Sequence, residues 1–443
     1  MLLGWDEAGD EYAGEYHGSL LLIVAGIGLT GAANDLITLF LAAELVSIPT
    51  YPALHGPATA AGRRRRSSTS LLSVFSSGLF LFGLSYLYGL AGTTNIPGIL
   101  DALAGSRSAA SLEETAGRLP WTGVLLVAVV MVVAGLGFRI TAVPFHFYAP
   151  DVYEGSTTPS AALLAFVPKI VGFAALLRLL GYVPILATSS PLAMGEQVPM
   201  LLWIMAAVTM TLGNILALLQ DNLKRMLAYS SVAHAGYMLI GLAVVPYLAS
   251  GAPGEAVGGA EAVLFYLVAY GAMTVGAFAV LHHLSSSGRP VETVDDLAGL
   301  SRTHPGISLV MALFLLSLIG IPLTAGFAGK FLLFWNAMGL SSATTDQAWL
   351  YRVLALIGAV NAAIGAWYYL RMATAMYLRE AIDPLPAPRT RPVVGTIAAC
   401  ALVTLALGVA PNLLMRPIRH ALASRTAEEQ AAARGGDRNV AER

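Results

Sequence analysis

The amino-acid sequence predicts an all-α, polytopic membrane protein with about eleven transmembrane helices. Of its 443 residues, 56% are hydrophobic and only 12% are charged, and the mean hydropathy is +0.70. A chain this apolar is not a soluble globular protein. Its apolar residues form runs long enough to cross about 30 Å of hydrocarbon as helices. A net charge of −1 without a basic stripe gives no reason to expect a nucleic-acid partner.

Turns and polar residues separate the apolar runs of the N-terminal half. The turn Gly31–Asp35 divides the first run from the second, the basic run Arg63–Arg66 precedes the third, and Thr158-Pro159 starts the fifth. The segment 1–15, which we expect to be cytoplasmic, is acidic and too weakly apolar for a signal peptide. The helices predicted in this half cover 16–32, 35–56, 68–91, 120–140 and 158–182.

Charged loops mark the helix ends of the C-terminal half. Lys224 and Arg225 lie between the sixth and seventh apolar runs, and Arg289 and Arg302 lie between the eighth and ninth. The tail 420–443 is polar and Ala-rich, which is typical of a frayed or disordered end. The helices predicted here cover 198–219, 226–248, 260–284, 306–338, 347–379 and 393–415.

The distribution of Lys and Arg predicts the orientation, because cytoplasmic loops are enriched in both. The loops after the second, sixth, eighth and tenth helices hold eleven: Arg63, Arg64, Arg65, Arg66, Lys224, Arg225, Arg289, Arg302, Arg379, Arg389 and Arg391. The other face holds five: Arg107, Arg118, Arg352, Arg416 and Arg419. We therefore expect a multi-pass protein of the cell inner (plasma) membrane with a cytoplasmic N-terminus and its C-terminus on the opposite side.

Four ionisable side chains, Glu44, Arg139, Lys169 and Lys330, lie inside the predicted helices. Each charge costs roughly 2.5 to 3.5 kcal/mol at the centre of a membrane helix on insertion scales, so such residues are rarely without a function. They usually pair with one another or line a path for ions or protons. Both signs in one chain indicate a relay.

Proline and glycine predict breaks in two helices. The fifth contains Pro168 beside Lys169, and the ninth contains Gly320–Gly326 upstream of Lys330. Proline frees a backbone carbonyl, which is tolerated at membrane depth only where protein groups or water bind it. Packing kinks explain such residues equally well, but a lysine beside each break favours an ion site of the kind found in transporters.

Helix counting also predicts an internal repeat. The first ten helices form two five-helix blocks, 16–182 and 198–379, followed by a single helix at 393–415. A block with an odd number of spans must be followed by its copy upside down, as in transporters built from inverted repeats.

Several motifs in the same order resemble one family, subunit N of the proton-pumping NADH:quinone oxidoreductase, respiratory complex I. The resemblance covers about 16–415, and its motifs are Ala43–Tyr51, Val143–His146, Pro150–Gly155, Thr158-Pro159, Asn222–Ser231, Ala233–Tyr237, Gly320–Pro322, Thr324–Phe327 and Gly329–Phe331. The sister antiporter-like subunits L and M differ at Phe265–Thr274, where they typically place a His or, in L, a Lys. The long lateral helix of subunit L is also absent from this sequence.

The resemblance implies a proton relay. Glu44 matches the family's helix-borne glutamate, Arg139 takes the place of its partner lysine, Lys169 matches the central lysine and Lys330 the lysine of the second broken helix, with His234 as a link between the last two. It also implies that the complex passes electrons from NADH through FMN and iron–sulfur clusters in partner subunits to quinone. This chain would then translocate protons without a cofactor or metal, beside neighbouring antiporter-like subunits and lipid.

Two features depart from the family pattern. A guanidinium at Arg139 stays protonated, so it can pair with Glu44 but cannot carry a proton. Family members also commonly have fourteen helices, and the three expected before residue 16 are absent from this sequence.

Two other functions are compatible with the residues. The chain can be a subunit of a cation/proton antiporter that is not linked to electron transfer, or a structural module that has lost pumping. The single cysteine, Cys400, excludes an internal disulfide and a Cys-bound iron–sulfur cluster, so redox chemistry is expected elsewhere.

Overall fold

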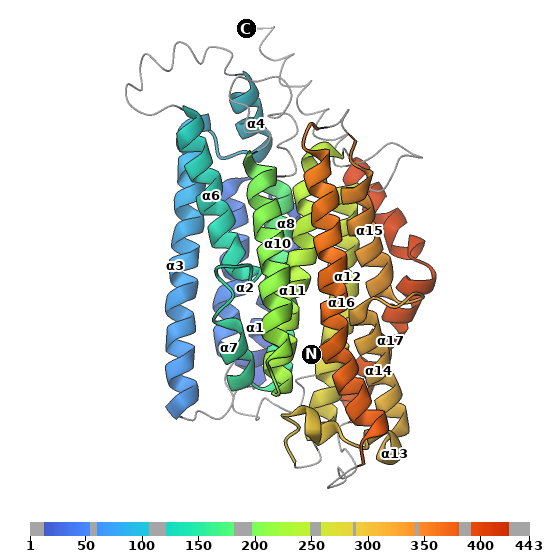
Figure 1. Cartoon of the computed structure of the whole chain (residues 1–443). Coiled ribbons are helices and arrows are strands. Elements are labelled where there is room, and N and C mark those ends of the chain that lie inside the picture. The colour runs from blue at the N-terminus through green and yellow to red at the C-terminus, as the bar shows by residue number, and fades with distance from the viewer. Residues whose placement is uncertain are drawn as a thin grey trace.

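The computed structural model describes residues 13–53, 60–105, 121–180, 197–248, 258–286, 289–341, 345–380 and 391–424. Most residues of these ranges are helical, and the only extended pairings among them are two isolated antiparallel bridges. Figure 1 shows the long helices standing side by side with roughly parallel axes. The predicted all-α class is therefore confirmed. The segment 1–12 and the tail 425–443 lie outside the described residues.

The N-terminal half contributes five long helices and two short ones. The long helices are α1 (Ala13–Ala32), α2 (Leu36–Ala53), α3 (Ala60–Ala91), α6 (Trp121–Arg139) and α8 (Thr158–Leu180), and the short ones are α4 (Ile96–Gly105) and α7 (Ala149–Gly155). The long helices match the five predicted helices to within a few residues at most ends, except that α3 starts earlier, at Ala60, and so includes the basic run.

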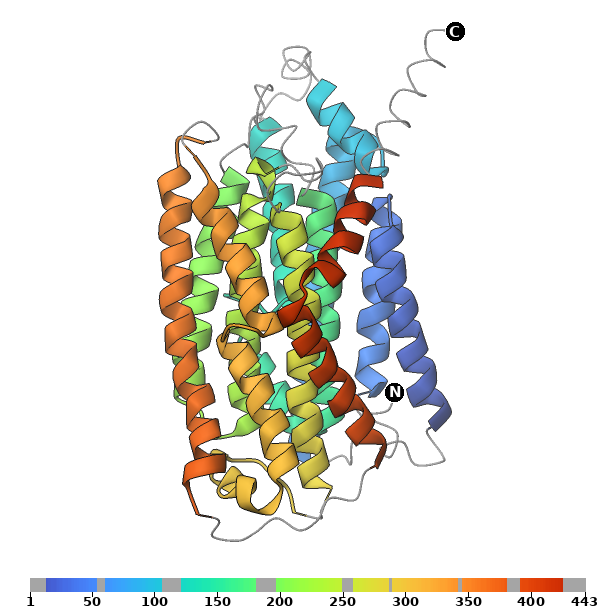
Figure 2. The ribbon, with the colours of Figure 1, turned by 90° about the vertical axis from the view of Figure 1, so that its right-hand side faces the viewer.

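The C-terminal half contributes the remaining helices. They are α10 (Gln197–Leu218), α11 (Leu223–Val244), α12 (Gly259–Ser285), α14 (Pro305–Ile319), α15 (Ala325–Gly339), α16 (Ala348–Leu378) and α17 (Arg391–Val409), with short η2 (Val245–Tyr247), η3 (Val294–Leu297) and α13 (Leu300–Thr303). In Figure 2, α17 crosses the other helices obliquely.

Length and composition make this a multi-pass membrane protein. Seven helices of the described residues are long and apolar enough to cross a membrane, and the shorter stretches Leu36–Thr50, Gly123–Arg139 and Pro305–Ile319 are also apolar. Large hydrophobic side chains face outward along the bundle, including Val74, Trp367 and Leu378. Such a surface is stable only against lipid or other membrane subunits.

The two helix breaks differ from the prediction in one respect. The ninth predicted helix, 306–338, is two helices, α14 and α15, separated at Gly320–Thr324, where Gly320 (φ +97°) and Leu323 (φ +71°) have left-handed backbones. The predicted break at Pro168 is wrong, because α8 continues through it. A proline deletes one backbone hydrogen bond and can bend a helix without ending it.

The interruption in the N-terminal half lies instead between α6 and α7. Residues 140–148 contain Thr141 in a left-handed conformation (φ 59°) and the cis Val143-Pro144 peptide. The break is thus in the fourth long element of each half, α6–α7 in one and α14–α15 in the other.

Both halves also contain the same bridge at the corresponding position. Asp35, before α2, pairs with Asn95, after α3, and Asn222, before α11, pairs with Thr293, after α12. Each of the two polar residues caps the helix that follows it: Asp35 accepts from the amides of Ile37 and Thr38, and Asn222 accepts from that of Arg225. In Figure 1, α4 follows the first bridge at the upper end, and α13 follows the second at the lower end.

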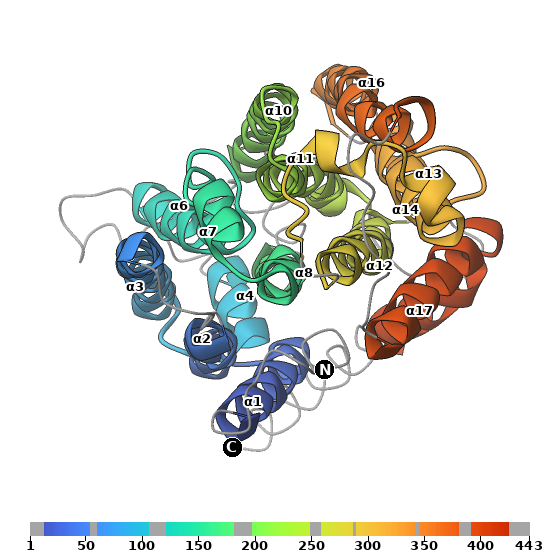
Figure 3. The same ribbon diagram turned by 90° about the horizontal axis from the view of Figure 1, so that it is seen from below.

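The centre of the molecule is formed by α8, α11 and α12. Figure 3 shows α8 and α12 side by side, with α1–α6 around one and α14–α17 around the other. α11 is buried along almost its whole length. Lys169, Arg178 and His234 on these helices are buried, as expected of polar groups inside a membrane.

Candidate functional site

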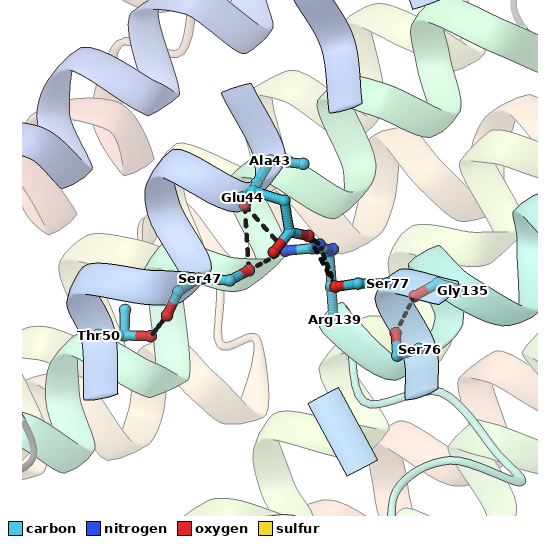
Figure 4. Close-up of polar contacts among 8 residues, drawn as sticks. All are labelled: Ala43, Glu44, Ser47, Thr50, Ser76, Ser77, Gly135 and Arg139. Carbon is cyan, nitrogen blue, oxygen red and sulfur yellow. Dashed lines mark hydrogen bonds and ion pairs between the residues drawn. The ribbon is translucent and has the colours of Figure 1, made fainter. Parts of the chain in front are cut away.

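The first pair of the predicted relay joins α2 to the end of α6. Arg139 Nη2 lies 2.5 Å from Glu44 Oε1, and the two side chains are 6% and 19% exposed. Figure 4 shows the guanidinium and the carboxylate facing each other between the two helices. The predicted intramembrane ion pair is therefore present in the structure.

Hydroxyl groups and a backbone carbonyl hold this pair. Arg139 Nη1 donates to Ala43 O at 3.0 Å and to Ser47 Oγ, and Nη2 also contacts Ser77 Oγ at 3.3 Å. The Ser77 hydroxyl donates to Glu44 Oε1 at 2.6 Å. The guanidinium is thus bound from two helices, α2 and α3, which makes it a fixed positive charge.

Lys169 lies where α8 meets the α6–α7 interruption and α11. Its side chain is fully buried, and Nζ donates to Thr141 Oγ1 at 3.1 Å and to Ser231 Oγ at 2.6 Å. In the described part of the chain no carboxylate lies within ion-pair distance of this amine. Two neutral hydroxyls are its polar partners, and they accept from an ammonium or donate to a neutral amine.

His234 lies on α11, about one turn after Ser231. Both of its ring nitrogens contact tyrosines. Nδ1 is 2.6 Å from Tyr266 Oη of α12, and Nε2 is 3.0 Å from Tyr369 Oη of α16. The rings of Tyr237 and Tyr270 pack around the imidazole at centroid distances of 5.5 and 5.2 Å. The histidine is only 1% exposed.

Lys330 binds the end of the broken helix. Its Nζ donates to Leu318 O at 2.8 Å and Ile319 O at 3.0 Å, which are carbonyls at the C-terminus of α14 left without helical partners by the break. It also lies 4.7 Å from the centroid of the Tyr237 ring. The break therefore creates the binding site of the Lys330 amine, because the carbonyls that it frees accept hydrogen bonds from this amine.

Contacts and shared helices together place the five predicted residues in one row across the bundle. Arg139 and Thr141 belong to one stretch, Thr141 contacts Lys169, Lys169 contacts Ser231, and His234 lies on the same helix as Ser231. A Cβ added at Gly329, next to Lys330, would lie 2.2 Å from the ring of Tyr266, which contacts His234. The row crosses from α2 to α15 through buried residues.

The sequence analysis missed the hydroxyl groups of this row: Ser47, Ser77, Thr141, Ser230, Ser231, Tyr266 and Tyr369. Serine, threonine and tyrosine are common in membrane helices, so nothing in their spacing distinguished them. Three of them do fall within the motifs that carry the family resemblance, namely Ser47, Ser230 and Ser231.

Asp151 and Glu154 both lie on α7. Arg225 Nη1 contacts Asp151 Oδ1 at 2.6 Å and Glu154 Oε2 at 2.9 Å, which ties α7 to the start of α11. Lys224 donates to Ser156 O at 2.8 Å beside them. The two carboxylates therefore order the connection between α6 and α8. Across the described ranges, no group of three or more His, Cys, Asp or Glu side chains is arranged to hold a metal.

A model of one family matches most of the chain. It is described as the transmembrane family of NADH:quinone oxidoreductase and Mrp antiporters, and it matches residues 33–358. Among curated proteins, NADH-quinone oxidoreductase subunit N of Trichlorobacter lovleyi is 39% identical over 414 residues, covering 91% of this chain and 76% of the relative. Subunit N of Anaeromyxobacter sp. is 39% identical over 412 residues, covering 90% and 75%.

Solved structures show the same fold. A chain of respiratory complex I from Thermus thermophilus with bound aureothin superposes with a TM-score of 0.70 and 29% identity, covering 91% of this chain and 79% of that one. A chain of the Mrp complex from Dietzia sp. has a TM-score of 0.74 at 20% identity, covering 93% and 79%. At that identity the second similarity concerns the fold alone.

Proposed function

The chain belongs to the NADH:quinone oxidoreductase/Mrp antiporter transmembrane family, and we propose that it is the proton-translocating subunit N of an NADH:quinone oxidoreductase, respiratory complex I. The relatives with this name are 39% identical over nine-tenths of the chain, whereas the Mrp structure is 20% identical. The oxidoreductase subunit is therefore favoured over a cation/proton antiporter that works without electron transfer.

The buried row from Glu44 to Lys330 is the observation that carries the proposal. Two lysines, Lys169 and Lys330, lie inside the bundle with hydroxyl or carbonyl partners, and His234 lies between them. Burial disfavours an ammonium and a nearby carboxylate favours it, so changing charges in the row make such a lysine take up or release a proton. Groups of this kind have no packing reason to be in a membrane core.

Within this row we assign the roles according to whether each group can take up and release a proton. Arg139 is a fixed charge that holds Glu44, and movement of Glu44 alters the field at Lys169. Lys169 and Lys330 take up and release protons, and His234 links the two lysines. Electron transfer from NADH to quinone, with FMN and iron–sulfur clusters, takes place in partner subunits, and this chain needs no cofactor of its own.

The two halves act as inverted five-helix repeats, 16–182 and 198–379, followed by a separate helix at 393–415. The corresponding bridges Asp35–Asn95 and Asn222–Thr293, and the breaks in the fourth long element of each half, support this division. In an inverted pair each break lies near the midplane, with one half-path opening to each side.

The partners are the other membrane subunits of the complex, above all the neighbouring antiporter-like ones, together with lipid. The orientation follows the positive loops: Arg225, Arg289 and Arg302 lie on the face that we assign to the cytoplasm of the cell inner membrane. The C-terminus then lies on the opposite side.

Lys169 provides the test. We expect Lys169→Ala to reduce proton pumping by the assembled complex sharply, with quinone reduction falling beside it where the two are coupled. Lys169→Arg is the matched variant, since it keeps the charge and the hydroxyl partners but cannot release a proton. It should also fail to pump.

The measurement is proton uptake or release by the purified complex in vesicles during NADH oxidation, with co-purifying subunits identified by mass spectrometry. Normal pumping by fully assembled Lys169→Ala would remove this lysine from the relay. Recovery of pumping in Lys169→Arg would mean that only a fixed charge is required.

A further inference from the structure

Four side chains from three helices form an unbroken hydrogen-bonded series in the C-terminal half. Ser230 Oγ contacts Tyr369 Oη, Tyr369 Oη lies 3.0 Å from His234 Nε2, and His234 Nδ1 lies 2.6 Å from Tyr266 Oη. Every member can both donate and accept a hydrogen bond. The series therefore needs no water molecule to be continuous.

The series is sealed from lipid. Ser230, His234, Tyr266 and Tyr369 are each at most 2% exposed. Buried tyrosines usually find a hydrogen-bond partner, so a single such contact has a structural explanation. Two tyrosines on opposite nitrogens of one histidine go beyond this, because they fix the imidazole between two exchangeable protons.

At each end of the series a neighbouring residue leads to one of the two buried lysines. Ser231, which follows Ser230 in α11, accepts from Lys169 Nζ at 2.6 Å. At the other end, the Tyr266 ring fills the space left by Gly329 on α15, and Lys330 follows Gly329. The series thus lies between the two lysines, and the path at each end is completed by one further step, through Ser231 from Lys169 and from Tyr266 across to Lys330.

The chemistry of a neutral imidazole gives the series a direction. One ring nitrogen carries a proton and the other accepts one, so one tyrosine must donate to the ring while the other accepts from it. Reversing the tautomer reverses both hydrogen bonds. The whole series consequently has two alternative arrangements of its protons with the same heavy-atom positions.

We propose that Tyr369 and Tyr266 are relay residues that pass the proton through His234 between Lys169 and Lys330, an inference that rests on the proposed function. A proton arriving from the Ser230 side bonds to Tyr369 Oη as the original hydroxyl proton moves to His234 Nε2. The proton on Nδ1 then moves to Tyr266 Oη, whose own proton leaves toward Lys330. One proton enters and one leaves, each hydroxyl keeps one O–H bond, and the imidazole changes tautomer.

Another tyrosine of α16 provides a matched comparison. Tyr351 is 2% exposed, and its hydroxyl donates to Tyr247 Oη at 3.4 Å. It lies about five turns before Tyr369 on the same helix. Its hydroxyl is therefore remote from the series.

The test removes one hydroxyl at a time from the assembled complex. We expect Tyr369→Phe and Tyr266→Phe to lower the initial rate of proton pumping at least about tenfold, as for removal of a proton-transfer group. Tyr351→Phe deletes a buried hydroxyl on the same helix and should pump at nearly the wild-type rate. Equal pumping by Tyr369→Phe and Tyr351→Phe in assembled complexes would overturn the proposal.

A second variant keeps the test decisive if a phenylalanine variant does not assemble. A 3,5-difluorotyrosine at position 369 retains the hydroxyl and its contacts but is more acidic. The pH profile of pumping should then move to lower pH, whereas the same replacement at 351 should leave it in place. An unchanged profile at 369 would overturn the relay role.

Lys169→Ala in the same vesicles separates this inference from the proposed function. Loss of pumping in Lys169→Ala with normal pumping in both Tyr→Phe variants contradicts the tyrosine relay alone. Normal pumping in Lys169→Ala contradicts the proposed function, and the tyrosine relay falls with it.

Discussion

At the scale of single residues, Arg139 and Lys169 are two buried cations with different surroundings. Arg139 is bound to Glu44 and to groups of α2 and α3, whereas Lys169 touches only the hydroxyls of Thr141 and Ser231 among its polar partners. A guanidinium cannot release its proton, and a lysine amine can. The chemistry of the side chains therefore separates a fixed charge from an exchangeable one.

We predict that the effect of a substitution at Arg139 depends on whether it keeps the positive charge. Arg139→Lys keeps a positive group opposite Glu44 and should pump nearly normally, whereas Arg139→Met should pump less and be less stable. Glu44→Gln should also lose activity, because breaking one side of a buried pair costs about 3 to 5 kcal/mol.

Proton pumping and the thermal midpoint of the purified complex measure these effects. Glu154→Gln is a suitable control, because its carboxylate is one of two that contact Arg225 near the surface. Wild-type pumping in both Arg139→Lys and Arg139→Met would show that this position has dropped out, leaving a relay that begins at Lys169.

At the scale of elements, the break between α14 and α15 depends on close backbone approach. A Cβ added at Gly326 would lie 1.8 Å from Ser317 O, and the Gly326 amide donates to Ser317 Oγ at 3.1 Å. Since backbone stands on both sides, no side-chain rotation can relieve the contact. The position of Lys330, one turn later, follows from this packing.

We predict that Gly326→Ala displaces α15 from α14 and reduces both assembly and pumping. Overpacking of a tight core typically costs about 1 to 3 kcal/mol, and a backbone clash lies at the upper end or beyond. Gly339→Ala, at the end of the same helix, meets nothing within 4 Å and should be neutral. The amount of subunit in the membrane complex and its thermal midpoint are the measurements. Equal values for the two variants would contradict the packing argument.

A second element, the turn between α12 and α13, should become less stable at acidic pH. Burial alone would raise the pKa of Asp296, but hydrogen bonds from Thr293 and Glu292 and the charge of Arg289 outweigh it and lower this pKa below its usual 3.8. The stabilising carboxylate is thus fully present above about pH 4, and its contribution is lost as the pH falls through the lowered pKa. Stability of the turn should therefore decrease on acidification.

Hydrogen exchange of the Glu292 and Thr293 amides measures this response, because both donate to Asp296 Oδ2, at 3.1 and 2.8 Å. After correction for intrinsic rates, their protection should decrease below about pH 4. Asp296→Asn should show low protection at every pH. Protection that stays constant down to pH 2 would contradict the assignment.

At the scale of the whole molecule, an arginine of the last long helix in each half binds a turn at the start of that half. Arg178 of α8 donates to Ala33 O and, at 3.0 Å, to Asn34 Oδ1; Arg371 of α16 donates to Gln220 O and lies 3.3 Å from Asp221 Oδ1. Both arginines thus bind the turn between the first and second helices of their own half. This is a third correspondence between the halves, besides the bridges and the breaks.

We predict that Arg178→Gln and Arg371→Gln each lower the thermal midpoint of the complex, since a hydrogen bond from a charged group contributes about 1.5 to 3 kcal/mol. The two effects should add in the double variant, because the turns belong to separate halves. Arg302→Gln breaks an exposed pair with Glu380 and should have little effect. A double variant no less stable than either single variant would contradict the expectation that the two arginines stabilise their halves independently.

The sequence by itself determined the class, the helices and the chemistry of the charges. Runs of apolar residues located the helices, because a backbone in lipid must satisfy its own hydrogen bonds. Gly320–Gly326 identified the second break, and Glu44, Arg139, Lys169 and Lys330 were singled out as charges inside apolar runs. These features follow from composition and local backbone chemistry, which a linear sequence contains. The family came from the motifs, and His234 was added by that resemblance.

The tertiary structure alone decided which groups meet. Pro168 proved to lie in a continuous helix while residues 140–148 carry the interruption, and hydroxyls such as those of Ser231, Tyr266 and Tyr369 joined the row without any sequence signal. The physical reason is that lipid is as apolar as the interior of the bundle, so helices such as α8 and α12 are apolar on every side. Hydrophobic periodicity then does not indicate which face turns inward, and only the packing of helix against helix brings Lys169, His234 and Lys330 into one row.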